Sequence, residues 1–105
     1  MSGTSPTALT LRELRADGWL AEVVERWVPG ANVRRDLFGG FDVLAIKNGT
    51  TLAVQVTTSD HVAARVRKIA ELPHIGTIRE AGWQLEVHGW HKDGRRWTVR
   101  KVDVS

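Results

Sequence analysis

Two short apolar runs separated by a tight turn form the clearest pattern in the chain. Phe41–Lys47 and Thr51–Thr58 have the length of buried strands, and the Asn-Gly pair at 48–49 is a strong signal for a hairpin turn. Each run holds one polar side chain where a core residue is expected, Asp42 in the first and Gln55 in the second. The pattern therefore predicts a β-hairpin that carries two polar groups in an apolar environment.

The other elements follow from helical spacing, from alternation and from the positions of Gly and Pro. In chain order we expect a helix over 8–17, a helix over 19–28, a helix from Ser59 or Asp60 to about Glu71, a short helix over 75–81, a strand over 83–90 and a last strand over 96–102. Residues 19–28 fit a strand equally, because they are rich in β-branched and aromatic side chains. We favour a helix that continues the first.

The order of these elements predicts the fold class. A helix, strands, a helix and more strands indicate an α/β sandwich, with a mixed sheet of about four or five strands flanked by helices. Residues 1–7 are small and polar and predict a flexible tail, which leaves 8–105 as a single domain with one modest core. Among the tryptophans, we expect Trp83 and Trp97 in the core. Trp27 and Trp90 are expected at the surface, where they would stack on bases or cover a dimer contact.

Composition narrows the chemistry more than it identifies a function. The 105 residues are 42% hydrophobic and 26% charged, which is typical of a globular domain. There is no cysteine, so neither a disulfide nor a thiolate metal site can form. No apolar stretch approaches the roughly 20 residues of a membrane span, so we expect no membrane association and a cytoplasmic location. The formal charge of +3 gives weak support to an anionic partner.

Asp42 and Gln55 are the candidate site residues that the pattern itself provides. Side chains at matching positions of neighbouring antiparallel strands project to the same side of the sheet. A carboxylate beside an amide there can hold one Mg²⁺, an ion that prefers oxygen ligands. The alternative is that both side chains bond to nearby backbone groups. The four histidines lack the spacing of a zinc site, and nucleophile and phosphate-loop motifs are absent.

The order of Asp42, a dozen residues and then the tripeptide Gln55-Val56-Thr57 resembles the motif of the PD-(D/E)XK nuclease superfamily. The resemblance covers residues 8–72 and is greatest to small Holliday-junction-resolvase-like members from phages and archaea. The motif is degenerate here, because Gln55 stands for the usual Glu and Thr57 for the usual Lys. The glutamate that many relatives carry on their first helix has three candidates in this chain: Glu13, Glu22 and Glu25.

This resemblance implies a restriction-endonuclease-like fold and a metal-dependent DNA endonuclease that hydrolyses phosphodiester bonds with Mg²⁺ or Mn²⁺. It places the metal on Asp42, Gln55 and the Val56 carbonyl, and it gives Thr57 the task of positioning water or phosphate. Lys68 on the following helix would replace the missing lysine, with Arg65 as the other candidate. The residues expected to contact nucleic acid are Arg34, Arg35, Arg65, Arg67 and Lys68. The other interpretation of the 65–68 segment is a solvated helix face.

The resemblance also implies partners. We expect DNA, branched DNA included, and a homodimer, in the cytoplasm of a host cell if the protein is phage-encoded. Two alternatives remain open because of the substituted motif. One is a catalytically inactive DNA-binding module on the same fold, and the other is a phage assembly or interaction protein.

Overall fold

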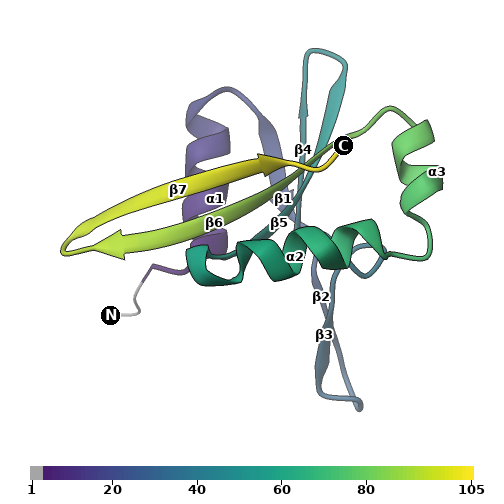
Figure 1. The fold of residues 1–105 in the computed structure, drawn as a ribbon, viewed down its shortest axis with the longest axis horizontal. Helices are drawn as coiled ribbons and strands as arrows, with labels where there is room; N and C mark the ends of the chain where they lie inside the picture. The colour runs from purple at the N-terminus through teal and green to yellow at the C-terminus, as the bar shows by residue number, and fades with distance from the viewer. Residues whose placement is uncertain (1–3) are drawn as a thin grey trace.

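The computed structural model describes residues 4–105, in which a mixed sheet carries helices on both faces (Figure 1). The helices are α1 (Pro6–Ala16), α2 (Val62–Ala70) and α3 (Ile75–Glu80), with a single 3₁₀ turn, η1 (Ser59–His61), before α2. The strands are β1 (Leu20–Val23), β2 (Arg26–Val28), β3 (Val33–Arg35), β4 (Val43–Lys47), β5 (Thr50–Thr58), β6 (Gln84–Asp93) and β7 (Arg96–Asp103). Within residues 4–105, no helix has the length and apolarity needed to cross a membrane.

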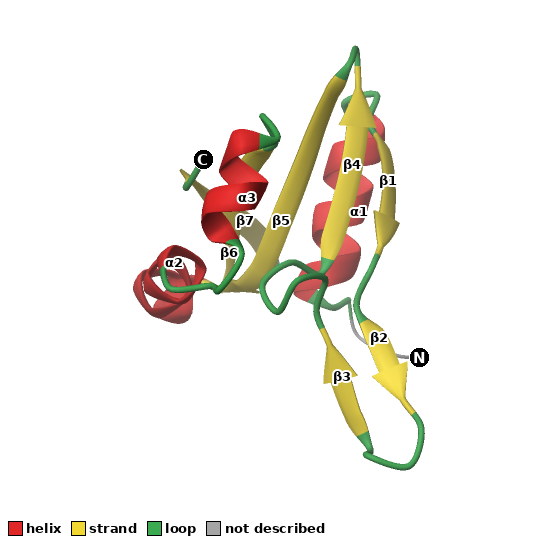
Figure 2. Ribbon diagram, turned by 90° about the vertical axis from the view of Figure 1, so that its right-hand side faces the viewer, coloured by secondary structure: helices red, strands yellow, loops and turns green. Residues whose placement is uncertain are grey.

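Five strands form the main sheet in the order β1-β4-β5-β6-β7. Only β5 and β6 run parallel, because η1, α2 and α3 make the crossover between them, and the other pairs are antiparallel. The α1 helix covers one face, while α2 and α3 lie on the other face beside β5 and β6 (Figure 2). The predicted α/β sandwich with a mixed sheet is confirmed.

The β4–β5 hairpin forms as the apolar runs predict. Asn48 and Gly49 take φ angles of 49° and 76° at the turn, and the ladder pairs Lys47 with Thr50 and Val43 with Val54. Successive side chains of these strands point to opposite faces of the sheet, and each face has its own hydrophobic core. Val43 and Val54 face α1, whereas the positions of opposite parity, Asp42 and Gln55 included, face the α2 side.

The helix predicted over 19–28 is wrong. The chain instead forms β1, pairs it with β4 at the edge of the main sheet, and continues into a separate two-stranded sheet of β2 and β3. Gly18, with a φ of 90°, ends α1 and reverses the chain, so α1 and residues 19–28 cannot be one helix. Ala21, 1% exposed, is the one buried residue of this segment and packs in the core on the α1 side, whereas Leu20, Val23 and Trp27 are exposed.

Smaller differences concern ends and faces. The α1 helix begins at Pro6, so Pro6 and Thr7 are helical and not part of a tail; residues 1–3 of that tail lie outside the described residues. The α2 helix begins at Val62, after η1. The prediction for Trp90 is wrong: β6 is covered on both faces near its centre, and Trp90 is 6% exposed. Trp27 is 53% exposed, as expected.

Glycine allows the close packing of α2 against the sheet. A Cβ built on Gly89 of β6 would overlap the Val62 side chain at the start of α2, and one on Gly40 would overlap Leu72. Both contacts are on the same side of the sheet as Asp42 and Gln55. The helix is therefore held near enough to β5 for its own side chains to reach those two residues.

Candidate metal and nucleic-acid site

The site is built around Asp42, which directly precedes β4. The Asp42 side chain is 5% exposed, and its Oδ1 accepts a hydrogen bond of 3.0 Å from the backbone N–H of Val56 on β5. Gln55 Nε2 lies 3.4 Å from Asp42 Oδ2. The β4–β5 hairpin therefore brings Asp42, Gln55 and Val56 together, as the resemblance implies. The backbone hydrogen bond to Asp42 also matches the alternative interpretation from the sequence.

The environment of Asp42 disfavours its charged form. Burial raises the pKa of the Asp42 carboxyl from 3.8 to about 7; the Val56 amide opposes this shift, while the negative charges of Asp36 and Glu25 add to it. A buried carboxyl with a raised pKa and neighbouring acids is typical of a functional site.

Two further carboxylates approach Asp42. Glu25, Asp36 and Asp42 each offer one oxygen within 4.8 Å of the others, the only such group of three His, Cys, Asp or Glu ligands in residues 4–105. Glu25 lies between β1 and β2. The residue before it, Val24, donates its backbone N–H to the Asp42 carbonyl at 2.9 Å, which holds this segment beside Asp42. Asp36 follows β3. The three acids therefore come from three different segments.

Sequence reasoning missed Asp36 and placed Glu25 on a helix. A signal for Asp36 is present in the chain: the Gly39-Gly40 pair lies between Asp36 and Asp42, within four residues of each, and allows a tight loop. In the structure the Leu37 N–H bonds to the Phe41 carbonyl at 2.7 Å, closing that loop and bringing Asp36 to Asp42. No comparable local signal exists for Glu25, whose position depends on the pairing of β1 with β4.

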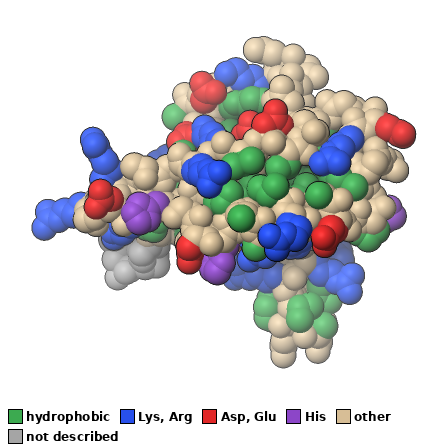
Figure 3. All heavy atoms as spheres, viewed as in Figure 1, with side chains coloured by type: hydrophobic (Ala, Val, Ile, Leu, Met, Phe, Trp, Pro, Cys, Tyr) green, Lys and Arg blue, Asp and Glu red, His purple; other side chains and the backbone are tan. Residues whose placement is uncertain are grey.

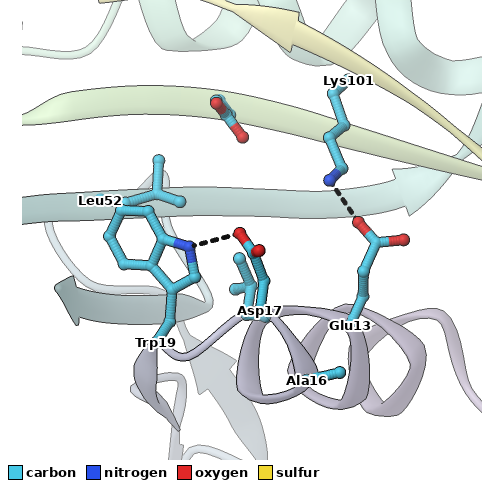
Figure 4. Close-up of a pocket in the computed structure, with 8 residues that line it drawn as sticks. Glu13, Ala16, Asp17, Trp19, Leu52 and Lys101 are labelled. Atoms are coloured by element: carbon cyan, nitrogen blue, oxygen red, sulfur yellow. Dashed lines mark hydrogen bonds and ion pairs between the residues drawn. The ribbon is translucent and has the colours of Figure 1, made fainter.

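The other two first-helix candidates lie elsewhere. Glu13 pairs with Lys101 on the α1 side of the sheet, and Glu22 pairs with Arg15 at 3.7 Å. Glu13 also lines a hollow of about 640 Å³ between α1 and the sheet (Figure 4). Its other acids are occupied as well: Asp17 Oδ2 accepts from the Trp19 indole N–H, and Glu86 bonds to His88. This hollow is on the opposite face from Asp42.

Lys68 is the cation that the structure brings to the site. Its Nζ lies 3.4 Å from Gln55 Oε1 and 3.6 Å from Asp36 Oδ2, and the side chain is 38% exposed. Thr57 lies on β5 two residues beyond Gln55, so the two side chains project to the same side of the sheet, and Thr57 is buried. The structure thus brings positions 42, 55, 56 and 68 together, with Thr57 on the same side of the sheet.

The predicted arginines divide into two groups. Arg34 and Arg35 lie on β3, immediately before Asp36, and Arg34 pairs with Glu25 at 3.2 Å. Arg35 and Lys68 line a groove of about 660 Å³ that begins at Asp36. Arg65 and Arg67 lie on α2 but line no part of this groove; Arg67 is exposed, and the Arg65 Nε is buried without a hydrogen-bond partner.

The fold is an α/β fold with a mixed five-stranded sheet, and an acidic cluster lies at the end of its β4–β5 hairpin. Among solved structures, the chain is similar to Hjc, a Holliday junction resolvase from the archaeal hyperthermophile Archaeoglobus fulgidus. The TM-score is 0.57 at 23% identity, and the match covers 97% of this chain and 72% of the resolvase chain. No protein-family model matches the chain, and no curated protein matches it. The likeness confirms the restriction-endonuclease-like fold; the degenerate motif remains a prediction.

Proposed function

We propose that the protein is a metal-dependent DNA endonuclease of the Holliday-junction-resolvase type, which hydrolyses phosphodiester bonds. One observation carries the proposal: three carboxylates from separate segments converge where the β4–β5 hairpin meets Lys68 of α2. Like charges gathered this closely raise the free energy of the folded protein unless a cation compensates them. The fold shared with an archaeal resolvase supports the same class of reaction.

The residues present suit Mg²⁺ or Mn²⁺. Both ions favour oxygen ligands, and Mg²⁺ is commonly held by one or two carboxylates with water completing its shell. Asp42, with Asp36 or Glu25, would supply the carboxylates. The Val56 carbonyl is turned to the same strand edge as its N–H, which contacts Asp42. Gln55 presents its nitrogen to Asp42, so it would join the ligands only after its amide rotates by half a turn.

The side chains of the site would divide the work of cleavage. A bound divalent ion supplies a Lewis acid and a more acidic water at neutral pH. Lys68 would place its ammonium beside the phosphate and stabilise the negative charge that develops there. Thr57 would orient water or phosphate through its hydroxyl. Arg34 and Arg35, on the strand that leads to Asp36, would neutralise neighbouring phosphates.

The test is cleavage of plasmid, linear duplex and four-way-junction DNA with Mg²⁺ or Mn²⁺. We expect cutting that Asp42→Asn abolishes, together with loss of Mn²⁺ binding measured by calorimetry. DNA binding in EDTA should be unchanged in this variant, because we expect the Asp42 carboxylate to meet the phosphate only through the bound metal. Cleavage that survives Asp42→Asn, with the variant shown to be folded, would overturn the proposal.

A second candidate is a DNA-binding module on this fold that has lost catalysis. The residues at positions 55 and 57 favour it, because a neutral Gln and a Thr stand where an acidic ligand and a cation would be needed. The double variant Gln55→Glu with Thr57→Lys restores one negative ligand and one cation. A gain in metal affinity and nicking would support a weakened enzyme, and no gain in either, in a folded protein, would support the binder. DNA retention that is weak and insensitive to salt would instead favour an assembly or interaction protein.

A further inference from the structure

The β2–β3 hairpin extends away from the rest of the molecule. We call residues Arg26–Arg35 the arm. Its strands pair only with each other and form a sheet separate from the main one, and the ribbon projects beyond both helical layers (Figure 2). Trp27 and Val33 on the arm are 53% and 46% exposed. A two-stranded hairpin without a core beneath it is marginally stable, and the exposed half of the Trp27 side chain is accessible to a partner.

The arm is basic and contains no acid. Its charged residues are Arg26, Arg34 and Arg35, all exposed. In the ladder Arg26 lies directly opposite Arg35, and like charges at directly opposed positions destabilise a hairpin. An anion bound between the two guanidinium groups would remove this repulsion. They also line a hollow of about 300 Å³ at the root of the arm, together with Asp36 and Phe38.

Both ends of the arm join the acidic cluster. Glu25 directly precedes Arg26, and Asp36 directly follows Arg35. A strand of DNA that places a phosphate at Asp42 would therefore meet the arm within a few nucleotides. Trp27 lies opposite Arg34 in the ladder, so the indole and one guanidinium project to the same face of the ribbon. Lys and Arg side chains and hydrophobic side chains share this lower part of the surface (Figure 3).

Arginine beside an exposed indole is the chemistry that binds unpaired nucleic acid. Phosphates are neutralised by the guanidinium groups, and a base with a free face stacks on the aromatic ring. Two-stranded ribbons also enter the grooves of a duplex. A second copy of this chain is the less suitable occupant, because two arms in contact would bring the exposed Arg26 and Arg35 of one against those of the other.

We propose that the arm holds DNA at a point where base pairing is interrupted by a gap in one strand. Trp27 stacks on the unpaired base, and Arg34, which lies opposite it in the ladder and shares its face of the ribbon, holds the phosphate beside that base in exchange for its ion pair with Glu25. Arg26 and Arg35 face the other side of the ribbon and hold a phosphate there. The proposal adds a substrate feature to the endonuclease proposed above and rests on it for the consequence in cleavage. The binding itself is measured without metal, so the two proposals can fail separately.

The experiment compares two DNAs of identical sequence, a full duplex and a duplex with a gap that leaves one 2-aminopurine unpaired. Binding is measured in EDTA with the wild type, Trp27→Ala, Trp27→Phe and the control Val33→Ala, an exposed apolar residue on the same arm. We expect Trp27→Ala to weaken binding to the gapped DNA about tenfold, to change duplex binding less than twofold, and to abolish quenching of 2-aminopurine fluorescence. Trp27→Phe should retain most of the gap preference, and Val33→Ala all of it.

Three results would overturn the proposal. Equal losses on both DNAs would mean that Trp27 contributes only to general affinity. No loss on either would remove the arm from the DNA interface. A change from dimer to monomer in Trp27→Ala, measured by sedimentation, would make the arm a contact between copies. If wild type prefers the gapped DNA but cuts none of the substrates, the arm proposal stands and the proposed endonuclease activity fails.

Discussion

At the scale of single residues, the decisive feature is a buried carboxyl among other carboxyls. Asp42 is held by one backbone hydrogen bond, while burial and the charges of Asp36 and Glu25 oppose its ionisation. The cations at the rim pair with the other two acids, Lys68 with Asp36 and Arg34 with Glu25. In the absence of a cation, a buried carboxyl of this kind destabilises the folded protein, and the same carboxyl binds a cation well. Functional sites commonly lower stability in this way.

The first prediction is a stability profile for Asp42 in the absence of metal. The folded-state pKa of about 7 is above the unfolded value of 3.8, so the group's stabilising contribution is complete below pH ~4 and is lost as pH rises through ~7. We expect Asp42→Asn to be more stable than wild type at pH 8 by roughly 2–4 kcal/mol, and the gap to shrink at pH 4. Urea unfolding at both pH values measures it. A variant that is less stable at pH 8 would make Asp42 a structural anchor.

A second residue-scale prediction concerns a buried polar group on the opposite face. Thr10 Oγ1 accepts from the Trp90 indole N–H at 2.8 Å and lies 3.3 Å from His88 Nδ1. Thr10→Val would leave both nitrogens without this partner, so we expect a loss of about 1–3 kcal/mol. Thr98→Val on β7, which is exposed, is the control and should change stability by less than about 0.5 kcal/mol. Similar values for both variants would mean that water replaces the threonine.

At the scale of elements, the packing of α2 against β5 and β6 decides which cation reaches the acids. Gly89 allows the close approach at Val62, and Val62 and Ile69 are buried beneath the helix. This fixes the rotation of α2, because residues three and four apart share a face. Lys68 is thereby directed to Gln55, while Arg67, its neighbour in sequence, faces solvent.

The prediction for this element compares Lys68 with neighbouring cations on α2. Lys68→Ala should stop cleavage at saturating DNA and reduce the salt dependence of binding by roughly one phosphate contact. Arg65→Ala should mainly reduce affinity. Arg67→Ala, which removes the same charge from the exposed side, is the control and should retain cleavage. Equal, small effects from all three variants would identify an ordinary solvated helix face. The site would then have no cation to replace the lysine that is Thr57 in this chain.

At the scale of the whole molecule, the exposed part of the sheet bears on assembly. The β1 strand is an edge, paired only with β4 in the described chain, and no described helix lies in front of these two strands (Figure 2). Leu20 and Ile46, directly opposed in the ladder, are 69% and 47% exposed. A free edge beside apolar side chains is a surface on which another chain can pair.

We therefore expect the predicted homodimer to form through β1. Leu20→Lys should convert the dimer to a monomer in sedimentation velocity, because a charge would be buried at the centre of the contact. Val33→Lys on the arm is the matched control and should leave the dimer intact. A wild type that sediments as a monomer at all concentrations would contradict this expectation and the dimer prediction together.

Short-range sequence signals were enough to determine the β4–β5 hairpin at the centre of the sheet. The turn at Asn48-Gly49 sets the register of two adjacent runs, and that register alone places Asp42 beside Gln55. The α2 helix and the β6–β7 hairpin were likewise predictable, because periodicity, Pro73 and the Asp93-Gly94 turn are short-range signals.

Tertiary contacts decided the remainder. Residues 19–28 carry spacing that suits a helix, and they became strands because β4 offered an edge and α1 a face for Ala21. That same pairing carried Glu25 to Asp42, and the loop closed by Leu37 and Phe41 carried Asp36 there. Spacing alone could indicate that Lys68 shares a face with Arg65, but only the rotation of α2 on the sheet directs it to Gln55. Pairing between distant strands is decided by burial over the whole domain, which no window of sequence contains.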